Sequence, residues 1–129
     1  MIVCLVDTNV LIDFLGRCGN MGFNERVMTA LSSGSAVSII TTIELLGWHR
    51  HTDQSRLDAA NLLARLREFP LERQEAETAI TLRSRSSIRL GDALIAATAL
   101  THGVPLMTRN TADFQNIDGL TLINPFEGE

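Results

Sequence analysis

The stretch IVCLVDTNVLIDF, residues 2–14, decides the fold of this chain. Its first five residues are apolar and mostly β-branched, which is typical of a strand buried inside a parallel sheet. Asp7 then begins a short polar turn. Beyond the turn, Val10, Leu11 and Phe14 recur at helical spacing. A buried strand that passes through a polar turn into an amphipathic helix is the building unit of α/β proteins, so we expect this architecture for the whole chain.

The rest of the chain continues this alternation. Apolar patterns predict further strands at residues 36–40, 69–71, 104–108 and 120–123, and helices at about 24–32, from 41 or 42 to about 50, 53–68, 74–83 and 92–100. Asn24 is the expected N-cap of the first of these helices. Most strands are separated by helices, which implies parallel pairing through right-handed crossovers. We therefore expect a three-layer α/β/α sandwich around a central, mainly parallel sheet, formed by one domain of residues 1–129.

Composition excludes several classes of protein. Apolar residues make up 45% of the chain and charged residues 20%, as in ordinary globular domains. No apolar run approaches the roughly 18 residues of a membrane span, and the first residues lack the pattern of a signal peptide. We therefore expect a cytoplasmic protein without membrane attachment. Cys4 and Cys18 show no spacing that suggests a disulfide framework or a zinc site.

The basic residues are all of one kind. The formal net charge is −4, and all eleven basic residues are arginine, so the chain contains no lysine. This excludes Walker-type phosphate loops, Schiff-base chemistry and lysine general bases. The negative balance is not typical of nucleic-acid-binding proteins. However, four acids bound to divalent cations would bring the balance of the loaded protein near neutrality.

Four acidic residues stand where a predicted strand ends or a predicted helix begins: Asp7, Glu44, Asp92 and Asp113. The carboxyl ends of parallel strands meet at one edge of a sheet, which is the usual ligand site of open α/β folds. Two like charges about 4 Å apart repel by about 4 kcal/mol at an effective dielectric of about 20, so converging carboxylates need a cation or stay partly protonated. Carboxylate oxygens suit Mg²⁺ or Mn²⁺, and two such ions can promote phosphodiester hydrolysis.

Each acid also has a structural explanation. Asp7 could cap the helix that follows it. Thr41 to Glu44 match the T-x-x-E capping box, which taken alone favours a capping role for Glu44. Asp92 stands in a first helical turn, where negative charge favours the helix dipole, and Asp113 suits a solvated loop. The metal site is therefore a hypothesis about the four acids together.

Four motifs run through nearly the whole chain. They are VDTNVLIDF (residues 6–14), IITTIELLGW (39–48), RLGDALIAATAL (89–100) and LMTRNTADF (106–114). In this order they resemble the motifs of PIN domains and, within that family, of the VapC-like toxins of bacterial toxin-antitoxin pairs. The first motif alone is moderately specific, whereas the four in sequence are strong. The resemblance implies a PIN fold and Mg²⁺- or Mn²⁺-dependent endoribonuclease activity.

The resemblance also implies roles for particular residues. Asp7, Glu44 and Asp92 are the expected core metal ligands. Some family members place the fourth acid directly after the Thr-Arg pair, where this chain has Asn110. We assign Asp113 as the fourth ligand, directly or through water, and Asn110 as an auxiliary group.

Two further groups of side chains are candidates for supporting roles. Thr8, Asn9 and Thr108 would orient the carboxylates through hydrogen bonds, although they also suit turns and helix caps. Arginines are the candidates for contact with RNA, since a guanidinium can bind phosphate through two parallel hydrogen bonds. A solvated surface run is the equal alternative. These arginines are Arg83, Arg85, Arg89 and Arg109.

The family further implies three kinds of partner. One is a second copy of the chain, in a homodimer that places two acidic sites along a shared groove. Another is a cognate antitoxin, whose C-terminal segment packs into an apolar groove and can push a basic side chain toward the acids. The third is a structured RNA, commonly tRNA or a ribosomal RNA loop. Trp48 could stack an RNA base or close the antitoxin groove, with a partly buried core position as the favoured alternative.

Three other functions are weighed against this one. A DNA nuclease of the same fold would normally carry extra helical elements, and 129 residues leave none to spare. A receiver-type signalling module depends on a lysine that this chain lacks. A catalytically silent PIN-like binding module is disfavoured by the intact acids.

Overall fold

Five strands form one parallel sheet whose central strand is part of the N-terminal apolar run. The computed structural model describes residues 1–126. The strands are β1 (Leu5–Val6), β2 (Ala36–Ser38), β3 (Arg67–Phe69), β4 (Leu106–Met107) and β5 (Leu122–Ile123). Their order is β3-β2-β1-β4-β5, and every neighbouring pair is parallel. Leu5 of β1 pairs with Ala36 on one side and with Leu106 on the other.

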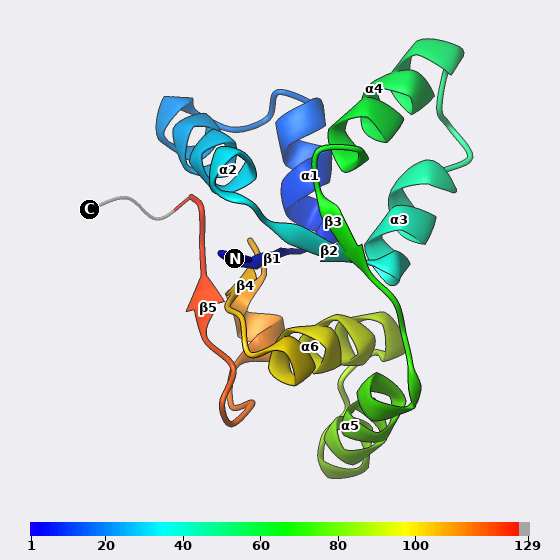
Figure 1. Cartoon of the computed structure of the whole chain (residues 1–129), viewed down its shortest axis with the longest axis vertical. Helices are drawn as coiled ribbons and strands as arrows, with labels where there is room; N and C mark the ends of the chain where they lie inside the picture. The colour runs from blue at the N-terminus through cyan, green and yellow to red at the C-terminus, as the bar shows by residue number, and fades with distance from the viewer. Residues whose placement is uncertain (127–129) are drawn as a thin grey trace.

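Helices cover both faces of this sheet. They are α1 (Thr8–Leu15), α2 (Met21–Ser33), α3 (Ile39–Leu46), α4 (Asp53–Leu63), α5 (Arg73–Arg85), α6 (Leu90–His102) and the short 3-10 helix η1 (Thr111–Phe114). In Figure 1, α1 to α4 lie on one side of the sheet and α5 and α6 on the other. The predicted three-layer α/β/α sandwich is therefore confirmed. Over residues 1–126, no helix has the length and apolar character needed to cross a bilayer.

Side chains of the central strands alternate between two hydrophobic clusters. Leu5 and Leu106 pack with Ile95 of α6 on one face of the sheet. Val6 and Met107 point to the other face, into the cluster formed with α1 and α2. Because both faces are covered by helices, successive residues of β1 and β4 are all buried. This explains why these strands are continuous apolar runs in the sequence instead of alternating patterns.

The start of α2 differs from the prediction. The helix begins at Met21, and Asn20 is its N-cap because the Asn20 side-chain oxygen accepts a hydrogen bond from the Phe23 backbone N–H (2.8 Å). The predicted cap, Asn24, lies inside the helix, so that prediction is wrong. The earlier start brings Phe23 into the core, where it is fully buried.

The edge strand β3 also differs from the prediction. The helix expected over residues 53–68 ends at Leu63, and Arg67–Phe69 pairs with β2 in place of the strand expected at residues 69–71. Residues 67–69 pair with β2 through their backbone, although the apolar spacing of the sequence predicts a helix up to residue 68. Arg67 and Glu68 are both exposed, and charged side chains are common on edge strands, where they discourage pairing with another chain.

Helix α3 begins directly after β2. Ser38 is its N-cap, and the Ser38 hydroxyl oxygen accepts a hydrogen bond from the Ile40 backbone N–H (3.1 Å). The predicted start at Thr41 or Thr42 is therefore wrong. Because the helix starts earlier, Thr41 lies within it and is fully buried, and Glu44 falls in its second turn.

Candidate active site at the carboxyl edge of the sheet

Asp7 follows β1 and is the N-cap of α1. Its Oδ1 accepts a hydrogen bond from the Thr8 backbone N–H (2.8 Å). Its Oδ2 accepts hydrogen bonds from the Thr108 hydroxyl (2.8 Å) and from Asn9 Nδ2 (3.2 Å). Asp7 is only 5% exposed. It therefore caps a helix, as the structural alternative predicts, and its carboxylate is also held by side chains from α1 and from the end of β4.

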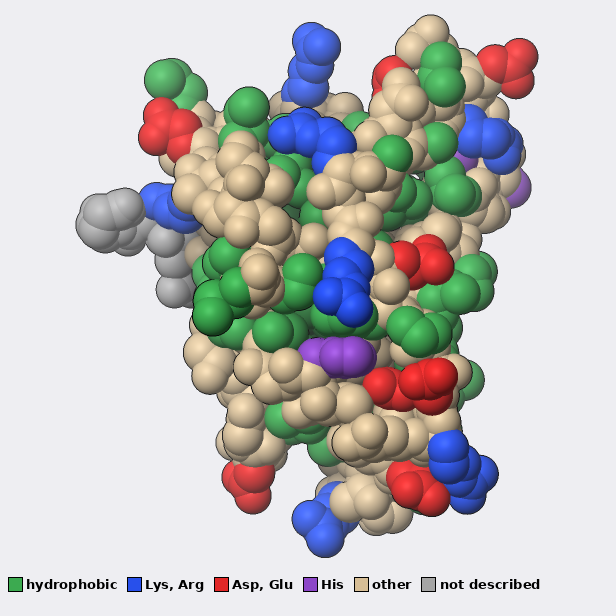
Figure 2. Space-filling view, in the orientation of Figure 1, with side chains coloured by type: hydrophobic (Ala, Val, Ile, Leu, Met, Phe, Trp, Pro, Cys, Tyr) green, Lys and Arg blue, Asp and Glu red, His purple; other side chains and the backbone are tan. Residues whose placement is uncertain are grey.

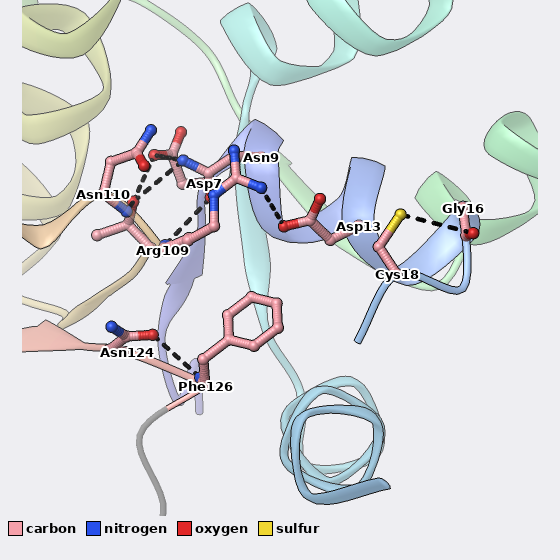
Figure 3. A network of polar contacts seen from close by, with 10 residues as sticks. Asp7, Asn9, Asp13, Gly16, Cys18, Arg109, Asn110, Asn124 and Phe126 are labelled. Atoms are coloured by element: carbon pink, nitrogen blue, oxygen red, sulfur yellow. Dashed lines mark hydrogen bonds and ion pairs between the residues drawn. The ribbon is translucent and has the colours of Figure 1, made fainter. Parts of the chain in front are cut away.

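A series of polar contacts joins the end of β4 to α1, as Figure 3 shows. The Arg109 backbone N–H donates to Asn9 Oδ1 (3.2 Å), and Asn9 Nδ2 donates to Thr108 Oγ1 (3.3 Å). The Arg109 guanidinium donates from Nη1 to Asp13 Oδ2 (2.6 Å), in an ion pair with a buried carboxylate. Asn110 joins through its main chain, since its backbone N–H donates to Thr108 Oγ1 (3.1 Å).

Glu44 is held by a residue that also binds Asp7. Glu44 Oε1 accepts a hydrogen bond from the Thr8 hydroxyl (2.6 Å), and Thr8 Oγ1 lies 2.9 Å from Thr41 Oγ1. A Cβ built on Gly91 would lie 3.8 Å from Glu44 Oε2, so the carboxylate is close to the start of α6. The capping-box interpretation of Glu44 is wrong, because Ser38 caps this helix.

Asp92 and Asp113 lie on the other side of the site. Asp92 stands in the first turn of α6, as predicted, and Asp113 is an exposed residue of η1. Burial raises the pKa of Asp92, and the negative charge of Asp113 raises it further, while Arg89 lowers it. Glu44 adds a smaller upward effect on the same pKa. The effect of Asp113 on this pKa shows that the two carboxyl groups are near each other, and the choice between Asp113 and Asn110 as the fourth ligand stays a prediction.

The pKa of Asp7 is affected by groups from several parts of the site. Burial raises it from its ordinary value to about 6. Hydrogen bonds from Thr108 and Thr8 lower this pKa, whereas the charges of Asp92 and Glu44 raise it. Since Asp92 in turn responds to Asp113, the structure brings the four predicted acids into one electrostatic neighbourhood.

The donor set of these acids fits a hard divalent cation. They do not form a closed cage, because no three His, Cys, Asp or Glu side chains within residues 1–126 converge closely enough to hold a metal ion. Mg²⁺ usually keeps several waters and is bound through one or two carboxylates, so an open set of acids suits it. The charge that raises the pKa values of Asp7 and Asp92 is also the charge that a cation would neutralise. The carboxylate oxygens of Asp7, Glu44, Asp92 and Asp113 are therefore donors of the kind that Mg²⁺ or Mn²⁺ prefers, and which of them would hold an ion stays a prediction.

Two grooves reach these acids. The first, which we call the polar groove, has a volume of about 890 Å³ and contains Asp92 and Asp113 in its lining. Its other lining residues are Thr78, Thr81, Leu82, Arg85, Ser86, Ser87, Ile88, Arg89, Leu100, Gln115, Asn116, Ile117 and Asp118. The second, which we call the apolar groove, has a volume of about 360 Å³ and includes Glu44. It is otherwise lined by Ile12, Leu15, Gly16, Leu45, Trp48, His51, Ser55 and Asp58.

Trp48 belongs to the apolar groove and not to the core. It is 49% exposed, and its ring meets the His51 ring edge-on at a centroid distance of 5.2 Å. His51 is fixed in turn, with Nε2 2.6 Å from the Leu45 carbonyl oxygen and Nδ1 2.8 Å from Ser55 Oγ. The favoured interpretation of Trp48 as a core residue is therefore wrong, and the alternative of a groove residue fits the structure.

The structure separates the four arginines that the sequence groups together. Arg85, at the end of α5, and Arg89, just before α6, line the polar groove. Arg83 is exposed but is not part of that lining, and Arg109 is ion-paired with Asp13. On the face of the molecule in Figure 2, arginines and acidic side chains are interspersed and form no single basic patch. The Arg109 pairing was missed because Asp13 lies 96 residues away, and its only signal is an acid within an apolar helix.

Comparisons with known proteins agree with the motifs and the fold. A family model described as PIN domain matches residues 4–120. The chain therefore belongs to the PIN-domain family. It is 34% identical over 122 residues to ribonuclease VapC10 of Mycobacterium tuberculosis, which covers 90% of this chain and 89% of that protein. A local match to ribonuclease VapC1 of Rickettsia felis is 49% identical over 41 residues, or 32% of this chain and 31% of that protein.

Solved structures share the fold over nearly the full length. A toxin-antitoxin complex from Klebsiella pneumoniae contains a chain that is 31% identical, with a TM-score of 0.76 and coverage of 96% of this chain and 98% of that one. A DNA-bound VapBC complex from Salmonella typhimurium gives a TM-score of 0.85 at 22% identity, with coverage of 97% and 99%. The predicted resemblance to VapC-like PIN domains is thus confirmed.

Proposed function

We propose that this chain is a Mg²⁺- or Mn²⁺-dependent endoribonuclease, the toxin of a toxin-antitoxin pair, which hydrolyses phosphodiester bonds in structured cytoplasmic RNA such as tRNA or ribosomal RNA. The observation that carries the proposal is the position of carboxylates from separate segments at one edge of the sheet: Asp7 and Glu44 are both hydrogen-bonded to Thr8, and Glu44 lies close to the first turn of α6, which contains Asp92. The charges of Asp92 and Glu44 raise the pKa of Asp7, and the charge of Asp113 raises the pKa of Asp92. Similarity to proteins named ribonucleases over 90% of the chain supports it.

The residues around the acids orient them for this chemistry. Thr8 joins two of them, because its backbone N–H donates to Asp7 and its hydroxyl donates to Glu44. Thr108 and Asn9 hold the second oxygen of Asp7. Partners of this kind fix the direction of a ligating carboxylate and commonly affect metal affinity 10- to 100-fold, by rough estimate. When bound, a divalent cation would lower the pKa of the attacking water and stabilise the leaving oxygen.

The apolar groove supports the antitoxin part of the proposal. Ile12 and Trp48 are large apolar residues, 53% and 49% exposed, and Glu44 lies in the same groove. A partner segment seated there would bring its own side chains next to one of the proposed metal ligands. Solved relatives described as toxin-antitoxin complexes are consistent with such a partner. The homodimer is part of the same proposal, and sedimentation equilibrium of the purified chain tests it.

Glu44→Gln tests the catalytic role of the acids. Glutamine can keep the hydrogen bond with Thr8 but weakens an anionic metal site, so we expect RNA cleavage in Mg²⁺ to fall at least about 100-fold with the fold intact. Glu68→Gln is the matched control, because Glu68 also accepts a 2.6 Å hydrogen bond from a threonine hydroxyl, that of Thr42, but lies on β3. If Glu44→Gln still cleaves RNA, the role of Glu44 is structural and not catalytic.

The same assay separates the alternatives. Cleavage of single-stranded DNA in preference to RNA would indicate a DNA nuclease of this fold. A wild-type protein that cuts neither substrate in Mg²⁺ or Mn²⁺ would indicate a silent binding module. Thermal melting of each variant tests whether a loss of activity comes from unfolding.

A further inference from the structure

We infer that the polar groove binds a single-stranded segment of RNA, with two arginines on its phosphates and two threonine hydroxyls on its ribose 2′-hydroxyls. The inference rests on the proposed ribonuclease function and adds to it the site that distinguishes RNA from DNA. The groove is continuous with the acids, since Asp92 and Asp113 belong to its lining. A strand that lies in the groove therefore passes beside the proposed metal ligands.

The kind of side chain in the polar groove favours contact with the sugar-phosphate backbone. Single-strand binding without sequence preference commonly uses aromatic side chains on which bases stack. None of the residues described as lining this groove is aromatic. Guanidinium, hydroxyl and amide groups are present on eight of the fifteen lining residues, and these groups bind phosphates and ribose by hydrogen bonds. Three aspartates complete the polar lining, and two of them, Asp92 and Asp113, are the proposed metal ligands, whose charge a bound cation would offset.

Two arginines are available for phosphates. Arg85 and Arg89 are both exposed, and within residues 1–126 neither forms an ion pair. Arg73 and Arg109, by contrast, are paired with Glu77 and Asp13. Arg89 stands just before α6 and Asp92 lies in the first turn of that helix, and both line the groove, so Arg89 lies at its acidic end. Arg85 stands in the last turn of α5 and extends the basic lining away from the acids.

The threonines of α5 offer a way to recognise ribose. Thr78, Thr81 and Arg85 are spaced three and four residues apart, so they share one face of the helix. The Thr78 hydroxyl donates to the Gln74 carbonyl oxygen (3.2 Å), and the Thr81 hydroxyl donates to the Glu77 carbonyl oxygen (3.2 Å). Each hydroxyl has one hydrogen, which is used in the bond to the backbone carbonyl. The hydroxyl oxygens of Thr78 and Thr81 can therefore only accept hydrogen bonds from a ligand in the groove. A ribose 2′-hydroxyl can donate to them, whereas DNA has no such donor.

The size of the groove favours an unpaired strand over a duplex. Modules that recognise double-stranded RNA typically span about 16 base pairs and contact two successive minor grooves. The polar groove is bounded by one face of α5, the segment between α5 and α6, part of α6, and η1 with the segment that follows it. A single loop or end of a structured RNA fits this short surface.

Binding measured by fluorescence anisotropy tests the inference. The background is Asp7→Asn, which we expect to prevent cleavage; Asp7 lies outside the lining of the polar groove. The probes are a ten-nucleotide single strand in Mg²⁺, made once as RNA and once as DNA. Arg85→Gln and Arg89→Gln should each weaken both probes about tenfold and reduce the slope of log affinity against log salt by about 1. Arg83→Gln, on the same helix as Arg85 but outside the groove, should change both affinities by less than about twofold.

The proposed ribose contacts of Thr78 and Thr81 are tested by comparing the affinity for RNA with the affinity for DNA. The double variant Thr78→Val/Thr81→Val keeps the side-chain shape but removes both acceptors. We expect it to weaken RNA binding about fivefold or more while leaving DNA binding unchanged, so that the preference for RNA narrows. Equal losses for RNA and DNA would overturn the ribose role. Arg85 and Arg89 variants that bind like Arg83→Gln would overturn the whole inference.

The inference and the proposed function can fail separately. If the wild type cleaves RNA but the groove variants bind RNA normally, RNA binding in the polar groove is rejected and the proposed nuclease function is retained. Binding that depends on Arg85 and Arg89, in a wild-type protein that cuts no RNA in either metal, rejects the nuclease and leaves a groove that binds RNA.

Discussion

The polar and apolar grooves each contain different members of one set of acids, and they are built from opposite sides of the sheet. The polar groove belongs to α5, α6 and η1, and the apolar groove to α1, α3 and α4 (Figure 1). One groove contains arginines and hydroxyls, and the other contains Ile12, Leu45 and Trp48. The helices on the two faces of a sheet can therefore carry different binding residues. The strand ends between them can supply one reactive centre for both.

Asp7 lies between the two grooves and belongs to the lining of neither. It is joined to the apolar side through Thr8, which binds Glu44, and to the polar side through the charge of Asp92. A change at Asp7 should therefore affect the centre without altering either binding surface. A change in one groove should affect its own partner and spare the other.

The largest expected effect concerns the pH dependence of metal-free stability. The pKa of Asp7 is about 6 in the folded protein, against about 3.9 in an unfolded chain. The folded state therefore holds more protons on Asp7 between these values, so the contribution of Asp7 to stability without metal is greatest below about pH 4 and is lost as the pH rises through about 6. The whole change is on the order of 3 kcal/mol. Urea unfolding in EDTA from pH 4 to pH 8 measures it.

Asp7→Asn supplies the comparison for this measurement. The variant should lose most of the fall in stability between pH 4 and pH 8, since asparagine does not titrate. At pH 8 its gain over the wild type should be only about 1 kcal/mol, because an amide accepts fewer of the hydrogen bonds that Thr8, Asn9 and Thr108 donate. Mg²⁺ should stabilise the wild type at pH 8 and not the variant. An unchanged pH slope in Asp7→Asn would assign the titration to another group.

The next effect concerns the apolar groove alone. Trp48→Ala should weaken binding of the purified antitoxin about 30-fold or more, because a half-exposed tryptophan in an apolar groove is typical of a binding hot spot. RNA cleavage should stay within about twofold of the wild type. Leu57→Ala is the control, since Leu57 is 53% exposed on α4 but outside the groove. A parallel loss of RNA cleavage in Trp48→Ala would show that the two grooves are not independent.

The fold could be predicted because both faces of the sheet are covered. Buried strands such as β1 and β4 then appear as unbroken apolar runs, and helices separate them in the sequence. The limits of α3 and α4 could not be predicted from local patterns. The T-x-x-E match at Glu44 suggested a later start, but Ser38 caps α3, and pairing of residues 67–69 with β2 ends the helical pattern of α4.

The approximate positions of the candidate site residues could also be predicted, and for a related reason. Asp7 follows a strand and Asp92 lies in the first turn of a helix, and a parallel sheet brings such positions to one edge. Glu44 lies one turn deeper in α3 than the sequence suggested. The division among the arginines was not predictable, because it depends on contacts between distant segments. Arg83, Arg85 and Arg89 look equivalent in one basic segment, yet only Arg85 and Arg89 line the polar groove. No local pattern shows that Arg109 meets Asp13.

The smallest expected effect concerns this last pair, which lies outside both grooves. Arg109 is bound to Asp13 through its guanidinium and to Asn9 through its backbone, and Asn9 and the neighbouring Thr108 hold the Asp7 carboxylate. We therefore expect Arg109 to position Asp7 and not to contact RNA. Arg109→Gln should lower kcat for RNA cleavage about fivefold, while the RNA affinity and its salt dependence stay close to wild type.

Arg85→Gln should show the opposite pattern, with weaker binding and a reduced salt slope. Removing Arg109 alone leaves Asp13 as an unpaired carboxylate in a residue that is only 6% exposed, which costs stability. The double variant Asp13→Asn/Arg109→Gln removes that charge, so it should recover stability without recovering kcat. An Arg109→Gln protein that loses RNA affinity and salt dependence as Arg85→Gln does would place Arg109 on the substrate and extend the basic surface beyond the polar groove.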